Sequence, residues 1–207
     1  MKLLSTLALA ATIALTGCQS TSSTTDNQPI ELFNGSDLSN WTIESNGQFS
    51  VSNGVIKLNR GTGWLRSNEK FSDYVLTIEF RFMEDRANSG IFVRTQETMH
   101  QDEKGYPNNG YQVQAMDTME GNALGKLLPY GAPEFQHTFD LEALKRAYKP
   151  YGQWHTYEIT AKGETLEVKL NGEVISTATS IKNLDGHIGI QGEFGLLEFR
   201  KIEVLEL

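Results

Sequence analysis

Acidic and basic side chains interrupt an otherwise apolar pattern in residues 71–94. Every second residue from 74 to 82 is apolar, and the positions between them include Glu79 and Arg81. Because strand side chains alternate between two faces, this segment predicts a long strand with one apolar and one charged face. A carboxylate can accept a proton, and a guanidinium group donates several hydrogen bonds. The charged face is therefore either solvated or lines a polar cleft.

Other predicted strands extend the same kind of face. A polar turn at residues 84–88 leads into a second strand at 91–94, and we expect the two strands to form a hairpin. Alternation in later segments adds further polar side chains. The predicted polar face comprises Glu79, Arg81, Phe92, Arg94, Gln112, Gln114 and Gln191. Since several strands contribute to it, a polar cleft is favoured over a solvated sheet.

Two carboxylates are the first candidates for acid–base chemistry. Glu79 is the best base on the polar face, but it is equally well interpreted as an ion-pair partner of Arg81 or Arg94. Asp117 follows a predicted strand, where it could either reach a cleft or cap a turn.

The histidines do not predict a metal site. The four of them, at positions 100, 137, 155 and 187, lack the spacing of zinc ligands. His155 shares parity with apolar neighbours, which favours the edge of the core over a catalytic role.

The elements that must position these residues are short strands. Asn53-Gly54 and Asn171-Gly172 each separate two strand-like segments, which is a hairpin signal. Alternation slips between residues 200 and 203, which predicts either a bulge in the last strand or a strand buried on both faces. One helix is predicted, at 141–148 with Asp140 as N-cap. The fold class is therefore all-β, a two-sheet antiparallel sandwich with one short helix in a long loop at 118–152. We expect this loop to roof the cleft.

The N-terminus carries an export signal. Lys2 precedes an apolar run at 3–15, which is shorter than the ~20 residues of a membrane-spanning helix and suits a signal peptide. Residues 15–18 (LTGC) resemble the lipobox of bacterial lipoproteins, which implies cleavage before Cys18 and its lipidation. The alternative is an ordinary secretory signal with an incidental cysteine. Gln19, and not an aspartate, follows the cysteine, which in the lipoprotein sorting pattern resembles the signal for release to the outer membrane.

These features give the expected domain organisation. Residues 1–17 are the signal peptide, 18–29 the lipidated cysteine and a flexible tether, and 30–207 a single β-sandwich domain. The chain of 207 residues has 18 basic and 26 acidic residues, a net charge of −8, and no basic run, which argues against nucleic acid as a partner. The membrane, reached through a lipid on Cys18, is a predicted partner.

An ordered series of motifs resembles the bacterial 3-keto-disaccharide hydrolase domain family. The matching segments, in chain order, are 32–35 (LFNG), 74–81 (YVLTIEFR), 88–94 (NSGIFVR), 110–114 (GYQVQ), 152–159 (GQWHTYEI), 170–172 (LNG), 189–191 (GIQ) and 198–200 (EFR). The resemblance implies a concanavalin-like jelly roll that cleaves glycosidic bonds of sugars oxidised at C3, by elimination. Two positions depart from the family pattern: Gln112 stands where a glutamate is common, and Glu193-Phe194 replaces a His-Gly pair.

The resemblance gives the candidate residues roles. Elimination beside a ketone needs a base, an acid and donors for an enolate oxygen, and no cofactor. The predicted acid–base residues are Glu79, Asp117 and Glu193. Trp64, Tyr106 and Tyr130 could stack on a sugar ring or pack within the protein. The predicted substrate-binding residues are Arg81, Asn88, Arg94, Gln112, Gln114, Tyr130, His155 and Gln191. The alternative functions are a non-catalytic carbohydrate-binding module and a structural envelope lipoprotein.

Overall fold

The computed structural model describes residues 28–96 and 104–207, so the predicted signal peptide, Cys18 and most of the predicted tether lie outside the described residues. Within these ranges the chain forms fifteen strands and one helix. Their bounds are β1 Ile30–Glu31, β2 Trp41–Ser45, β3 Phe49–Ser52, β4 Val55–Asn59, β5 Gly63–Phe71, β6 Tyr74–Phe82, β7 Asn88–Thr95, β8 Gly110–Met116, β9 Leu127–Tyr130, β10 Gln136–Phe139, α1 Leu141–Ala147, β11 His155–Lys162, β12 Thr165–Leu170, β13 Glu173–Thr179, β14 Gly186–Gly192 and β15 Leu196–Glu206.

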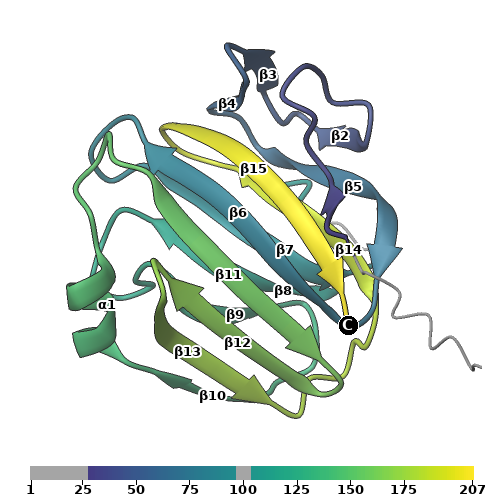
Figure 1. Cartoon of the computed structure of the whole chain (residues 1–207), viewed down its shortest axis with the longest axis vertical. Coiled ribbons are helices and arrows are strands. Elements are labelled where there is room, and N and C mark those ends of the chain that lie inside the picture. The colour runs from purple at the N-terminus through teal and green to yellow at the C-terminus, as the bar shows by residue number, and fades with distance from the viewer. Residues whose placement is uncertain (1–27, 97–103) are drawn as a thin grey trace, which may run out of the picture.

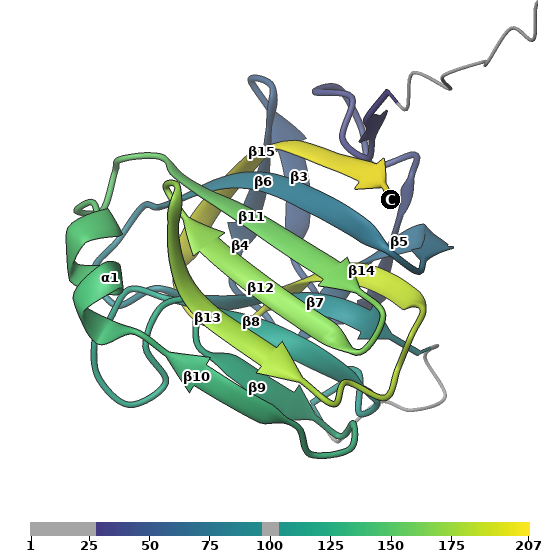
Figure 2. The ribbon, with the colours of Figure 1, turned by 60° about the horizontal axis from the view of Figure 1, so that its bottom comes forward.

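The strands form two sheets that stack face to face (Figure 1). One sheet has nine strands in the order β10-β13-β12-β11-β6-β15-β4-β3, with β1 added beside β15. The other has six in the order β2-β5-β14-β7-β8-β9, and Figure 2 shows it as a second layer beneath the first. Strand pairs in both sheets are antiparallel. The predicted all-β two-sheet sandwich is confirmed.

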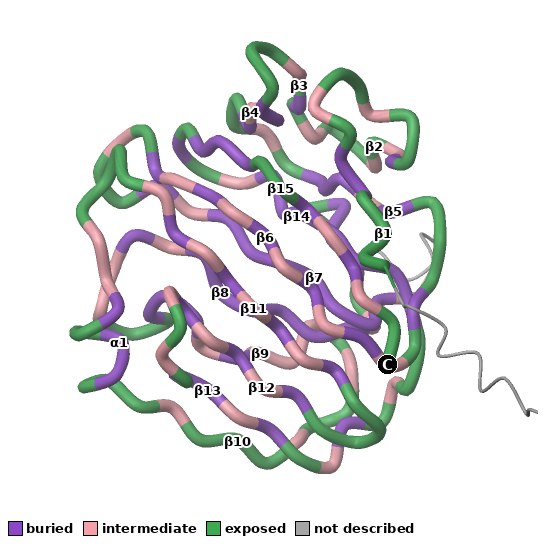
Figure 3. Tube along the Cα trace, in the orientation of Figure 1, coloured by how far each residue is buried: buried purple, intermediate pink, exposed green. Residues whose placement is uncertain are grey.

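The core lies between the two sheets. In β6 every second residue from Tyr74 to Phe82 is fully buried, while the residues between them are half-buried (Figure 3). Ile91 and Val93 of β7 and Val113 of β8 face them from the six-stranded sheet. Burial of such side chains contributes about 1.5–3 kcal/mol each, so this layer holds the sheets together.

The local predictions are confirmed. Asn53-Gly54 and Asn171-Gly172 both have positive φ at each position, as the tight hairpin turn requires. The Asp140 side chain accepts a hydrogen bond from the Ala143 N–H at 2.9 Å and caps α1. The register of β15 shifts between Arg200 and Ile202, which is the predicted bulge.

The segment 118–152 does not act as a roof. It contains β9, which pairs with β8 at the edge of the six-stranded sheet, and β10, which pairs with β13 at the edge of the nine-stranded sheet. The backbone groups of this segment therefore extend both sheets. In the described ranges no helix is long and apolar enough to cross a membrane.

The predicted hairpin of β6 and β7 is wrong. β6 pairs with β11 and β15 in one sheet, whereas β7 pairs with β14 and β8 in the other. The turn between β6 and β7 therefore carries the chain from one sheet to the other. Because the apolar side chains of both strands point into the core from different sheets, their polar side chains point to opposite outer surfaces of the sandwich.

Candidate active site

Buried carboxamides lie side by side on the outer face of the six-stranded sheet. Gln112 of β8 donates from Nε2 to Oε1 of Gln191 of β14 at 2.7 Å, and both side chains are buried. The two strands are separated by β7, and Gln112 reaches across it over Gly90, where a Cβ atom would overlap the Gln112 side chain. A glycine at this position is therefore required for the pairing.

A second chain of hydrogen bonds leads to a carboxyl group. Gln114 of β8 donates from Nε2 to Oδ1 of Asn88 at 2.9 Å, and Asn88 donates from Nδ2 to Oε2 of Glu193 at 2.5 Å. Burial raises the pKa of Glu193 above its usual value of 4.5, while the charge of Lys104 and the Asn88 hydrogen bond lower it. A raised pKa brings the protonated and ionised forms closer in free energy at higher pH, which suits a carboxyl group that both accepts and donates a proton.

Aromatic rings cover the middle of this face. Trp64 and Phe92 pack edge to face at 5.7 Å between ring centroids, and Tyr130 packs on Phe92 at 5.2 Å. Tyr106 donates from its hydroxyl to the carbonyl of Gly192 at 2.9 Å. Trp64 and Tyr106 are buried, so their role is packing, whereas Tyr130 stays partly exposed. The Trp64 Nε1 group is buried without a hydrogen-bond partner among the described residues.

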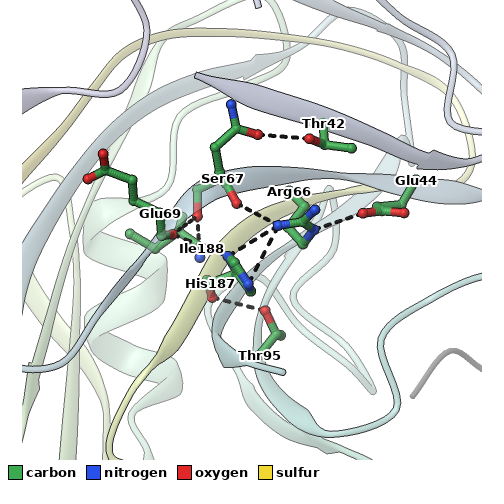
Figure 4. A network of polar contacts seen from close by, with 9 residues as sticks. Thr42, Glu44, Arg66, Ser67, Glu69, Thr95, His187 and Ile188 are labelled. Atoms are coloured by element: carbon green, nitrogen blue, oxygen red, sulfur yellow. Dashed lines mark hydrogen bonds and ion pairs between the residues drawn. The ribbon is translucent and has the colours of Figure 1, made fainter. Parts of the chain in front are cut away.

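A polar network occupies the other end of the same face (Figure 4). Arg66 of β5 donates from Nε to Glu44 of β2 at 2.8 Å, and its Nη1 lies 3.5 Å from each ring nitrogen of His187. His187 Nδ1 lies 3.2 Å from the carbonyl of Glu69. Burial and then the Arg66 charge lower the pKa of His187, which favours a neutral imidazole.

Sequence reasoning missed part of this face. Arg66 has the same parity as Trp64 in β5, so alternation could have placed it there. Lys104 lies in a segment without regular alternation, and no sequence signal points to it.

Glu79 and Arg81 lie on the outer surface of the nine-stranded sheet, so the prediction of one shared polar face is wrong. Arg81 donates to Glu198 at 2.8 and 2.5 Å, and Arg200 donates to Glu79 at 2.6 Å. The guanidinium groups of Arg81 and Arg200 lie 4.6 and 4.0 Å from the ring of Trp154. Both predicted residues are thus members of an ion-pair cluster away from Gln112 and Glu193.

Arg94 is fully buried and does not belong to the polar face. Its guanidinium donates to the carbonyls of Ser72, Gly163 and Asn183 and to the carboxylate of Asp73, at 2.5–3.2 Å. These partners come from separate loops. Arg94 therefore ties loops together at the sandwich edge.

His155 is also buried, on the core side of β11. Its Nε2 lies 2.9 Å from the carbonyl of Lys149, and its ring stacks on Phe80 at 5.4 Å. Burial lowers its pKa to about 4. This environment is that of a core-edge histidine, and it is not adjacent to the carboxamide row.

Asp117 lies at the end of β8, one residue beyond Met116. It accepts a hydrogen bond from the Tyr148 hydroxyl at 2.7 Å and lines a shallow depression of about 350 Å³ with Asp85, Arg86 and Thr118. Of the predicted acid–base residues, the structure brings only Glu193 into contact with the predicted amides. In residues 28–96 and 104–207 no three His, Cys, Asp or Glu side chains are grouped to hold a metal ion.

Comparisons with known proteins agree with this architecture. No curated protein matches the sequence. A crystal structure from Parabacteroides distasonis ATCC 8503, described as a "putative glycosyl hydrolase", is 21% identical with a TM-score of 0.64, covering 87% of this chain and 100% of that chain. The carbohydrate recognition domain of Emp47p is 17% identical with a TM-score of 0.57, covering 92% and 99%. A Bacillus licheniformis β-glucanase is 14% identical with a TM-score of 0.52, covering 86% and 98%.

These structures share the predicted jelly-roll sandwich. A model of the 3-keto-alpha-glucoside-1,2-lyase-like domain matches residues 28–205, which span nearly all of the two sheets. The chain therefore belongs to the family of 3-keto-alpha-glucoside-1,2-lyase-like domains, as the ordered motifs predicted.

Proposed function

We propose that this protein cleaves the glycosidic bond of sugars oxidised at C3, with Glu193 as the proton-transfer group. The observation that carries the proposal is the half-buried Glu193 carboxyl, held by Asn88 at 2.5 Å beside a row of carboxamides. Family membership supports the substrate class.

The chemistry begins at C2 of the sugar. A ketone at C3 acidifies the C2 proton, and the ionised Glu193 removes it while negative charge develops on the ketone oxygen. The electrons then form the C1–C2 double bond and restore the ketone as the C1–O bond breaks, and Glu193 returns the proton to the leaving oxygen. Addition of water across C1–C2 completes hydrolysis. A carboxyl group with a raised pKa suits both proton transfers.

The carboxamide row supplies the remaining interactions. Gln112 and Gln114 each donate one amide N–H to another side chain and carry a second, while Gln191 accepts through Oε1 in its side-chain pair. The amide N–H groups of Gln112, Gln114 and Gln191 beyond these bonds can donate to sugar hydroxyls or the enolate oxygen. Lys104 adds positive charge near Glu193, which favours the developing enolate. Asn88 positions the carboxyl group, and its hydrogen bond to Gln114 fixes its own amide.

The test is the release of the aglycone from a purified 3-keto-glucoside. Wild type should release it, and Glu193→Gln should lose at least 10²-fold in kcat/KM because the acid–base group contributes about that much. Glu79→Gln is the matched control: it removes a carboxylate from the other sheet and should retain activity within twofold. If both variants match wild type, or if Glu79→Gln is the inactive one, Glu193 does not transfer the proton.

A non-catalytic carbohydrate-binding module is the second candidate. Gln112 and Gln191 hydrogen-bond each other and are buried, an arrangement that needs no reaction to explain it. This candidate predicts that calorimetry detects binding of an unoxidised glycan, while no 3-keto-glucoside is cleaved.

We also propose that the protein is anchored to the outer membrane through a lipid at Cys18. The lipobox-like residues 15–18 motivate this proposal. Expression with a radiolabelled fatty acid should label wild type and leave Cys18→Ser unlabelled. Equal labelling of both would refute the anchor.

A further inference from the structure

Phe194 is an exposed aromatic side chain that directly follows Glu193. It is 54% exposed, although large aromatic residues contribute most when buried. Its backbone is nevertheless fixed: the Asn88 N–H donates to the Phe194 carbonyl at 2.6 Å, and the Phe194 N–H donates to the Asn88 carbonyl at 3.1 Å. The ring is therefore presented to solvent from a defined backbone position.

The same backbone pairing places Phe194 opposite Asn88, the residue that holds the proposed proton-transfer group. Side chains of directly opposed residues in an antiparallel pair lie on the same side of the sheet. Asn88 and Phe194 form such a pair, and the Asn88 side chain holds the Glu193 carboxyl at 2.5 Å. Phe194 thus follows Glu193 along the chain, in the direction away from Gln191, and is paired with the residue that holds the Glu193 carboxyl.

The loop between β4 and β5 covers one side of the ring. The Arg60 guanidinium lies over the Phe194 ring at 5.4 Å from the centroid and is paired with Glu84 at 3.1 Å. Arg60 has φ +73°, a left-handed conformation that non-glycine residues adopt at some cost and that recurs at functional sites. Arg60 covers one side of the ring, so the exposed surface of Phe194 is the part of the ring that Arg60 does not cover.

We propose that Phe194 is the stacking platform for the leaving group, an aromatic or pyranose aglycone ring. This inference rests on the proposed function, because it takes Glu193 as the point of cleavage. The carboxamides on one side of Glu193 match the hydroxyl-rich keto sugar, and the apolar ring on the other side matches the flat face of the group that departs. Phe194 therefore sets the preference for ring-bearing over small aglycones.

The experiment compares aryl and methyl 3-keto-glucosides with wild type, Phe194→Ala and Phe194→Tyr. For the aryl substrate, Phe194→Ala should lower kcat/KM about tenfold, mainly through KM, since an aromatic contact contributes about that factor. For the methyl substrate the change should stay within twofold, and Phe194→Tyr should retain wild-type values with both. Tyr151→Ala, which removes another exposed aromatic ring, is the matched control and should change neither substrate.

A binding measurement separates failure of this inference from failure of the proposed function. Saturation-transfer NMR with unoxidised phenyl glucoside should show transfer to the phenyl protons in wild type and its loss in Phe194→Ala. If wild type cleaves no 3-keto-glucoside and the NMR signal is still lost in Phe194→Ala, the proposed reaction is wrong, but Phe194 still binds the ring. If Phe194→Ala binds and cleaves aryl glucosides like wild type, the inference is overturned, and the exposed ring serves another contact, such as a second protein.

Discussion

Replacing Asn88 by alanine should raise the pKa of Glu193 by about one pH unit. Asn88 Nδ2 lies 2.5 Å from Glu193 Oε2, and this hydrogen bond favours the ionised carboxylate. Hydrogen bonds to charged groups contribute about 1.5–3 kcal/mol, and one pKa unit corresponds to 1.36 kcal/mol. Complete loss would therefore give about one to two units. Because Glu193 is only partly buried, water replaces part of the lost bond, which leaves about one.

The measurement is a carbon-detected NMR titration of the Glu193 side-chain carboxyl, assigned by its absence in Glu193→Gln. Gln114→Ala is the matched control, because it removes the donor to Asn88 Oδ1 without touching Glu193 and should shift the pKa by a few tenths. In an active enzyme the rising limb of kcat/KM against pH should move upward with the titration. An unchanged or lowered pKa in Asn88→Ala would refute the reasoning, since burial would then act without opposition from Asn88.

The remaining predictions concern stability. Because the pKa of Glu193 is raised in the folded protein, its stabilisation of the fold is present below pH 4.5 and lost as pH rises. Calorimetry should therefore show a higher melting temperature for Glu193→Gln than for wild type at pH 7.5 but not at pH 4. An equal gain at both pH values would contradict this. The pKa of His155 is lowered from 6.5 to about 4, so its stabilisation of the fold is fully present above pH 6.5. The free energy of unfolding should therefore fall by about 3 kcal/mol by pH 4. Urea unfolding of His155→Phe should show a flatter pH dependence than wild type, and an equally steep one would exclude His155 as the cause. Arg94→Met should lower the free energy of unfolding, measured in urea, by about 3 kcal/mol because it leaves buried carbonyl groups without a hydrogen-bond donor. A loss below about 1 kcal/mol would contradict the role of Arg94 in holding the loops together.

Local sequence chemistry predicted the elements of the fold. The Asn53-Gly54 and Asn171-Gly172 turns, the Asp140 cap and the bulge after Arg200 each depend on a few neighbouring residues, and all are found in the structure. Period-two alternation likewise identified the buried parity of β6. The ordered motifs predicted the family, which the match over residues 28–205 confirms.

The composition of the candidate site was only partly predictable. Asn88, Gln112, Gln114, Gln191 and Glu193 were candidates from the sequence, and the structure brings them together. The sequence could not separate them from the other candidates, because the alternation of buried apolar and outward polar residues is the same in a strand of either sheet.

Only the tertiary structure decided which polar residues meet. The chain crosses between sheets after β6, so Glu79 and Arg81 face away from Gln112 and Glu193, and Arg94 is enclosed by loops distant in sequence. Alternation is a property of a single strand and states which residues share its faces. Sheet membership depends on pairing with strands far along the chain, as β6 pairs with β15 and β7 with β14, and no local pattern encodes that choice.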